Sequence, residues 1–109
     1  MNELSAKKCV PCEGGVAPLS AAEAAALLGQ LHGDWKLAEN AKSVKRAYPF
    51  KDFYRTMSFV NAVAHIANVE DHHPDLEVGY NYCRVTFTTH AVAGLSENDF
   101  ICAAKLDRL

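Results

Sequence analysis

The sequence has no excess of basic residues: 11 Lys and Arg stand against 13 Asp and Glu, which gives a formal net charge of −2. Proteins that bind nucleic acid directly need clustered cations to contact the phosphates. The sequence also lacks an apolar run near the roughly 20 residues that cross a bilayer, and residues 1–8 lack the apolar core of a secretory signal. We therefore expect a cytoplasmic protein that binds neither nucleic acid nor membrane directly.

The sequence has only four cysteines, and their spacing does not match that of a complete metal site. Cys9 and Cys12 form a C-x-x-C pair, typical of half a zinc site or of a redox pair, whereas Cys83 and Cys102 stand apart. A structural zinc site needs four ligands, and no second C-x-x-C or H-x-x-x-H follows. Disulfides are not expected without a secretory signal. We therefore interpret the pair as reduced thiols in a flexible leader over residues 1–19.

The remaining residues, 20–109, are enough for one domain with its own core. Half of the chain is apolar and 22% is charged, which is ordinary for a globular protein. Ser20 and Glu23 form a capping-box pattern that opens a helix. A longer apolar stripe at helical spacing runs over residues 53–70, and it is broad enough to lie against a sheet or another subunit. Pro74 prevents this second helix from continuing.

Alternating apolar and polar residues predict strands on both sides of the long helix. The predicted elements, in chain order, are a helix from residue 20 to about 32, strands over 34–38 and 43–48, a helix over 53–70, strands over 76–80 and 82–90, and a helix from residue 96 to about 106. Hairpins separated by helices favour an antiparallel sheet. We predict a two-layer α+β sandwich, with a four-stranded antiparallel sheet and helices on one face, in the order α-β-β-α-β-β-α.

Three of the five histidines gather in one part of the sequence. His72 and His73 stand together before a proline turn, and His90 stands at the end of the last predicted strand. If that strand pairs with the one before it, His90 returns toward the turn, so that three imidazoles surround one hollow. Imidazole gives and takes protons near neutral pH. The pattern predicts a small proton-transfer site, in which Asp99 orients a histidine or a substrate N–H.

Simpler interpretations of the same residues remain open. Adjacent histidines in a surface turn are often solvated and idle, and Asp99 is also placed to cap the last helix with Ser96. Trp35 is either a core anchor or a platform for a flat ring. The three histidines together are also a candidate zinc site of a hydrolase, although two adjacent residues seldom ligate one ion.

The segment from Asp71 to Phe100 resembles the pterin-4a-carbinolamine dehydratase family. The family pattern has His-His-Pro, an aromatic residue, a Thr-His pair after a strand, Gly-Leu, and an acidic residue in the last helix. This sequence supplies them as His72-His73-Pro74, Tyr80, Thr89-His90, Gly94-Leu95 and Asp99, and Trp35 and Phe50-Lys51-Asp52-Phe53 also fit. One position departs from the pattern, because Asn68 stands where many members carry an acidic residue, and Glu70 follows two places later.

The resemblance implies a hydro-lyase that needs no metal or other cofactor. Its reaction would convert 4a-hydroxytetrahydropterin to quinonoid dihydropterin and water, as part of tetrahydrobiopterin recycling after aromatic amino acid hydroxylation. It implies His72, His73 and His90 as the catalytic set. The residues that it implies for substrate binding are Asp99, Trp35, Pro74 and Thr89.

The resemblance also implies a homodimer or homotetramer, since family members associate in these ways. Some animal relatives act as dimerisation cofactors of a transcription factor. A non-enzymatic interaction protein is therefore the alternative from another functional class, and the zinc hydrolase is a further one.

Overall fold

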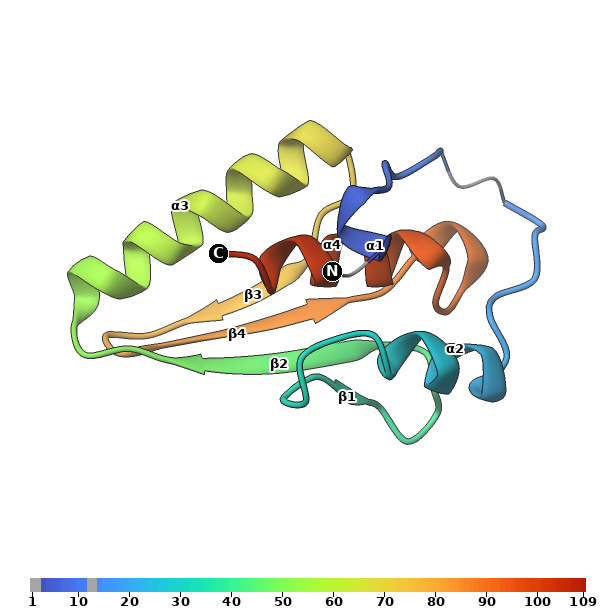
Figure 1. Cartoon of the computed structure of the whole chain (residues 1–109), viewed down its shortest axis with the longest axis horizontal. Coiled ribbons are helices and arrows are strands. Elements are labelled where there is room, and N and C mark those ends of the chain that lie inside the picture. Colours follow the sequence, from blue (N-terminus) through green and yellow to red (C-terminus); the bar gives the residue numbers. More distant parts are fainter. Residues whose placement is uncertain (1–2, 12–13) are drawn as a thin grey trace.

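The chain forms a four-stranded antiparallel sheet with helices packed on one side, as the sequence predicts (Figure 1). The computed structural model describes residues 3–11 and 14–109. The elements are α1 (Glu3–Ala6), α2 (Ala21–Leu28), β1 (Lys36–Leu37), β2 (Val44–Pro49), α3 (Phe53–Glu70), β3 (Asp75–Val78), β4 (Tyr82–Phe87), the 3-10 helix η1 (His90–Val92) and α4 (Glu97–Leu106). The strand order is β1-β2-β4-β3, so the two hairpins meet along β2 and β4.

The core lies between β2, β4 and α4. Cys83, Val85 and Phe87 alternate along β4 and are all buried, as the period of two predicts. Phe100 of α4 is fully buried, and Trp35 lies against Phe87 with ring centroids 6.2 Å apart. Since nearly every residue of α4 is buried, this short helix is the centre of the packing.

Helix α3 begins and ends where its sequence favours a boundary. The side chain of Asp52 accepts a hydrogen bond from the backbone N–H of Arg55 and so caps the first turn. At the other end, Asp71 adopts the left-handed conformation with φ 51°, and the N–H of His72 donates to the Ala67 carbonyl at 3.1 Å. Pro74 then prevents further helix, and β3 starts at the next residue.

The last strand is shorter than predicted. The sequence prediction extended it to residue 90, but β4 ends at Phe87 and His90 opens η1 instead. The chain folds back here because Thr89 and Gly94 pair as an isolated bridge, and Ala93 between them takes a positive φ of 55°. His90 is therefore held in a tight turn rather than on the strand. Likewise, the first strand is paired only over Lys36–Leu37.

Residues 3–11 lie against α4. Leu4 is 2% exposed and belongs to the core cluster, and Lys105 of α4 donates to the Ser5 carbonyl at 2.9 Å. The division of the chain at residue 20, with a flexible leader before it, stays a prediction. The described part of that leader nevertheless packs on the domain. Cys12 of the C-x-x-C pair lies outside the described residues.

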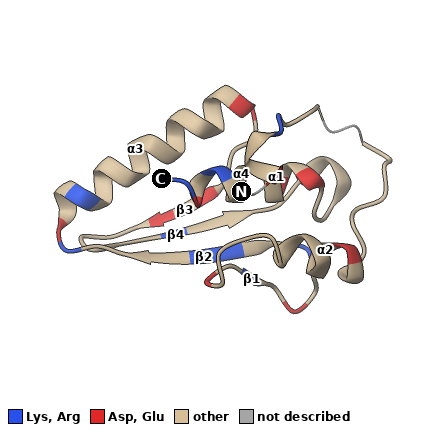
Figure 2. Ribbon diagram, viewed as in Figure 1, with Lys and Arg blue, Asp and Glu red and all other residues tan. Residues whose placement is uncertain are grey.

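Charges of both signs are spread over the helices and strands (Figure 2). In the described part of the chain, no helix is long and apolar enough to cross a membrane.

Replacement of Leu4 by alanine tests whether the start of the chain contributes to stability. Because the Leu4 side chain is buried, we expect Leu4→Ala to lower the free energy of unfolding by about 2–5 kcal/mol. Val16→Ala is the matched control, because Val16 is 56% exposed and its truncation should cost less than about 0.5 kcal/mol. Urea denaturation followed by circular dichroism measures both. Equal midpoints for Leu4→Ala and the wild type would show that this segment does not contribute.

Candidate active site

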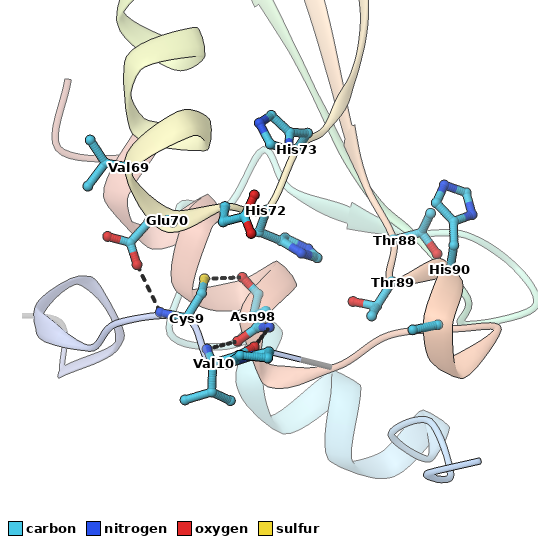
Figure 3. Close-up of a pocket in the computed structure, with 13 residues that line it drawn as sticks. Cys9, Val10, Val69, Glu70, His72, His73, Thr88, Thr89, His90 and Asn98 are labelled. Atoms are coloured by element: carbon cyan, nitrogen blue, oxygen red, sulfur yellow. Dashed lines mark hydrogen bonds between the residues drawn. The ribbon is translucent and has the colours of Figure 1, made fainter. Parts of the chain in front are cut away.

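The three histidines singled out in the sequence line one cavity of about 660 Å³ (Figure 3). His72 and His73 approach it from the turn between α3 and β3, and His90 from the start of η1. Thr88 and Thr89 lie between these two segments, on the residues that follow β4. The tight turn after β4 therefore brings His90 to the same hollow as the histidine pair, although it does so without an extended strand.

His72 is held by a buried carboxylate. Its Nε2 atom lies 2.6 Å from Oδ1 of Asp99, and the two side chains are 11% and 0% exposed. The His72 ring also stacks on Phe87, with centroids 6.0 Å apart and planes inclined by 11°. The ring is thus fixed in position and in orientation. A carboxylate at one ring nitrogen leaves the other nitrogen for a ligand and stabilises the imidazolium when the ring takes up a proton.

Asp99 collects hydrogen-bond donors from three segments of the chain. Besides His72, the Thr89 hydroxyl donates to Oδ2 at 2.7 Å, and the backbone N–H of Ser96 donates to Oδ2 at 3.0 Å. The Thr89 proton is engaged by Asp99, so the Ser96 hydroxyl at 2.8 Å is the donor to Thr89. A buried carboxylate is stable only when donors surround it. The capping and orienting roles predicted for Asp99 are therefore combined in one side chain.

His73 and His90 are exposed, in contrast to His72. Nε2 of His73 lies 3.0 Å from Oδ1 of Asn68, which is in the last turn of α3. Asn68 thus supplies a neutral partner at the position where the family pattern often has an acidic residue. Two adjacent histidines therefore have different surroundings, because His72 faces a buried carboxylate and His73 an exposed amide.

Three of the four predicted substrate-binding residues do not line this cavity, namely Trp35, Pro74 and Asp99. Trp35 is 1% exposed and its Nε1–H donates to Oδ1 of Asp107 at 2.7 Å, so here it is a core anchor. Pro74 is half-buried and lies in the turn after α3, between the histidine pair and the start of β3. Thr89 does line the cavity, and Asp99 reaches it through His72 and Thr89.

The spacing of residues did not predict the wall that residues 9–11 form on one side of the cavity. The N–H of Cys9 donates to Glu70 Oε1 at 2.8 Å, and Val10 exchanges two backbone hydrogen bonds with the side chain of Asn98. The sequence left the role of Glu70 in doubt. In the structure its carboxylate accepts the hydrogen bond from Cys9, and its Oε2 atom lies 3.9 Å from Nζ of Lys105. The hydrogen bonds of Cys9 and Val10 join residues that are separated by 61 and 88 positions in the sequence, so no local pattern reveals them.

Within residues 3–11 and 14–109, no three His, Cys, Asp or Glu side chains are placed to hold a metal ion. The three imidazoles therefore do not form a ready set of zinc ligands. What the cavity does offer is one histidine coupled to a carboxylate and two exposed histidines. That arrangement can remove a proton from one atom of a small molecule and deliver a proton to another.

The fold and the site together place the chain in a class of small α+β domains that carry a histidine–carboxylate pair and two further histidines around one cavity. Comparison of the sequence with known families makes the class specific. The chain belongs to the pterin 4 alpha carbinolamine dehydratase family, whose sequence model matches residues 17–109.

Individual relatives agree with this assignment. A protein of Legionella pneumophila (strain Corby) is 58% identical over 108 residues, which are 99% of this chain and 96% of the relative. A protein of Nitrosomonas eutropha is 60% identical over 107 residues, 98% of this chain and 93% of the relative. Both are named "Putative pterin-4-alpha-carbinolamine dehydratase". A crystal structure of a "transcriptional coactivator/pterin dehydratase" from Brucella melitensis is similar with a TM-score of 0.78 and 31% identity, over 84% of this chain and 96% of that chain.

Replacement of Asp99 by asparagine tests the carboxylate as the centre of the site. An amide has one acceptor oxygen where the three donors need two, and its NH₂ group would face one of them. We expect Asp99→Asn to lower the free energy of unfolding by about 3 kcal/mol. The control is Asp75→Asn on exposed β3, with an expected change within about 0.5 kcal/mol. Urea denaturation at pH 7 compares them, and equal losses for both variants would contradict a special role for Asp99.

Proposed function

We propose that this protein catalyses the dehydration of 4a-hydroxytetrahydropterin to quinonoid dihydropterin and water. The observation that carries the proposal is the convergence of His72, His73 and His90 on one cavity, with His72 bound to Asp99. Family membership supplies the substrate class, and the names of the relatives in Legionella and Nitrosomonas agree with it.

The reaction needs two proton transfers at neighbouring atoms of the pterin ring. The C4a hydroxyl leaves as water after it gains a proton, and the N5–H bond gives up its proton as the C4a=N5 double bond forms. An acid and a base are therefore required at the same time near neutral pH, and two different imidazoles suit them. The cavity has three imidazoles, so the number of groups is sufficient.

We assign His72 as the base or ring-binding partner and His73 or His90 as the acid at the hydroxyl. Asp99 supports this division, because a carboxylate beside His72 stabilises the positive charge that the ring gains when it accepts the N5 proton. His73 and His90 are exposed in the cavity mouth, where they can reach a leaving hydroxyl and exchange protons with water. Thr89 would act through Asp99 rather than on the pterin itself.

The proposal is tested by stopped-flow measurement of dehydration, with carbinolamine generated enzymatically and alanine variants of the three histidines. Since a positioned acid or base contributes a hundred-fold or more, we expect each variant to lower kcat/KM by about 100-fold. The control is His65→Ala, because His65 is exposed on α3 and is not part of the cavity wall. It should keep the wild-type rate.

Unfolding midpoints of the same variants separate catalysis from folding. The His73 and His90 side chains are exposed, so their variants should unfold within about 0.5 kcal/mol of the wild type. If both variants fold and retain full dehydration rates, the histidines are not catalytic. The interaction protein would then be the better explanation.

We further propose that the protein works in pterin recycling as a homo-oligomer of two or four copies. Large aromatic side chains are exposed together at the start of α3 and at the turn after β3: Tyr54 is 84% exposed, and Phe53 stacks on Tyr80 with centroids 6.4 Å apart. Such a patch is typical of an interface between proteins, and a second copy of the chain is the partner that family precedent favours.

Light scattering after gel filtration measures this association. The wild type should elute with the mass of two or four chains. Tyr54→Ser should shift the distribution toward the monomer, because it removes exposed apolar surface without disturbing the core. A monomeric wild type at micromolar concentration would contradict the proposal.

A further inference from the structure

Two cysteines that are distant in sequence meet beside the cavity. Sγ of Cys9 lies 3.4 Å from Sγ of Cys102, across 93 positions of the chain. Cys9 is half-buried and lines the cavity, whereas Cys102 is fully buried on α4. We propose that these two residues are a thiol modification site: they form a reversible disulfide by exchange with a small disulfide such as oxidised glutathione. This inference does not depend on the reaction proposed above.

Contacts that do not involve sulfur hold the two thiols together. The N–H of Cys9 is bound by Glu70, and the next residue, Val10, is bound by both polar atoms of the Asn98 side chain. Asn98 and Cys102 are four residues apart on α4, so they lie on the same side of that helix. The segment that carries Cys9 is therefore docked beside Cys102 before any bond forms. Closing the remaining distance requires a small local shift rather than refolding.

The two thiols differ in accessibility, and this difference gives the order of reaction. Cys9 is open to the cavity and is the thiol that a small disulfide reaches first. Cys102 is fully buried, so a small disulfide in the solvent does not reach it, and the hydrogen bond to the Cys9 sulfur together with burial raises the pKa of its thiol. Once Cys9 carries a mixed disulfide, Cys102 is the thiol placed to resolve it, because its sulfur lies 3.4 Å from the Cys9 sulfur.

The exchange balances in two steps. The Cys9 sulfur, as a thiolate, attacks one sulfur of oxidised glutathione, the glutathione S–S bond breaks, and one glutathione thiolate leaves. The Cys102 thiol then gives up its proton and attacks the Cys9 sulfur as a thiolate, the bond between Cys9 and glutathione breaks, and the second glutathione leaves as a thiolate that takes up a proton. The two cysteines lose two electrons and two protons, and one oxidised glutathione becomes two reduced molecules. Excess reduced glutathione or dithiothreitol drives the same steps in reverse.

Cys83 provides an internal comparison. It is also fully buried, on β4, and burial raises the pKa of its thiol. No cysteine among the described residues lies within sulfur hydrogen-bond distance of it. Cys83 and Cys102 are thus equally buried, but only Cys102 lies close to a second, accessible sulfur among the described residues. This closeness, rather than burial, defines the proposed site.

The test uses the full chain with Cys12→Ser, which removes the other cysteine near Cys9. The protein is incubated with oxidised glutathione, blocked with N-ethylmaleimide and digested with trypsin. Cys9, Cys83 and Cys102 then fall in separate peptides, 9–36, 56–84 and 85–105. We expect peptides 9–36 and 85–105 to appear joined, lighter than their sum by the mass of two hydrogen atoms. The joined form should be at least about ten-fold more abundant than any form joined through Cys83.

A variant that also carries Cys102→Ala is the matched control, and it should instead hold one glutathione on Cys9. The proposal is overturned if Cys9 carries glutathione while an intact Cys102 takes up N-ethylmaleimide. It is overturned equally if Cys9 in the wild type pairs with Cys12 and leaves Cys102 free. Melting curves give a second readout that does not require the Cys102→Ala variant to fold. The oxidised Cys12→Ser protein should melt about 5 °C or more above its reduced form.

Discussion

The buried carboxylate of Asp99 is the interaction on which the rest of the site depends. It joins three parts of the chain that share no local sequence pattern: the turn after α3, the end of β4 and the first turn of α4. A charge with 0% exposure is tolerated only because each of its neighbours donates to it. The same bonds that stabilise the charge therefore fix the position of His72. The packing of these three segments and the orientation of the His72 ring thus depend on the same group.

This arrangement also explains how two adjacent histidines can have different chemistry. The left-handed residue Asp71 turns the chain sharply at the end of α3, so that His72 points toward the core and His73 toward the surface. One ring is locked between Asp99 and Phe87, and the other lies beside Asn68 at the cavity mouth. An acid and a base need different surroundings to act at the same pH. The turn between α3 and β3 gives His72 and His73 such different surroundings.

Much of the fold was predictable, because its elements carry local signals. The capping residues, the helical apolar stripe of α3 and the alternation along β4 each depend on neighbouring residues, and all three were recognised. The gathering of the three histidines followed from the pairing of β3 with β4. Two features that sequence reasoning missed depend on contacts over long separations, because the wall made by residues 9–11 and the burial of Leu4 arise from packing on α4. The third, the turn at His90, arises from the short Thr89–Gly94 bridge, which ends the strand although the alternation of the sequence continues. Trp35 remained ambiguous because its burial and its hydrogen bond to Asp107, 72 positions away, are what distinguish an anchor from a stacking platform.

The docking of residues 3–11 has a consequence for where the working unit of this protein begins. The family's sequence model starts at residue 17, yet the hollow that holds the histidines is closed on one side by residues 9–11. A chain trimmed to the matched residues would uncover the apolar surface of α4 on which Leu4 rests, and it would leave Glu70 and Asn98 without the backbone groups they bind. The residues that the family model matches are thus fewer than the residues that enclose the cavity.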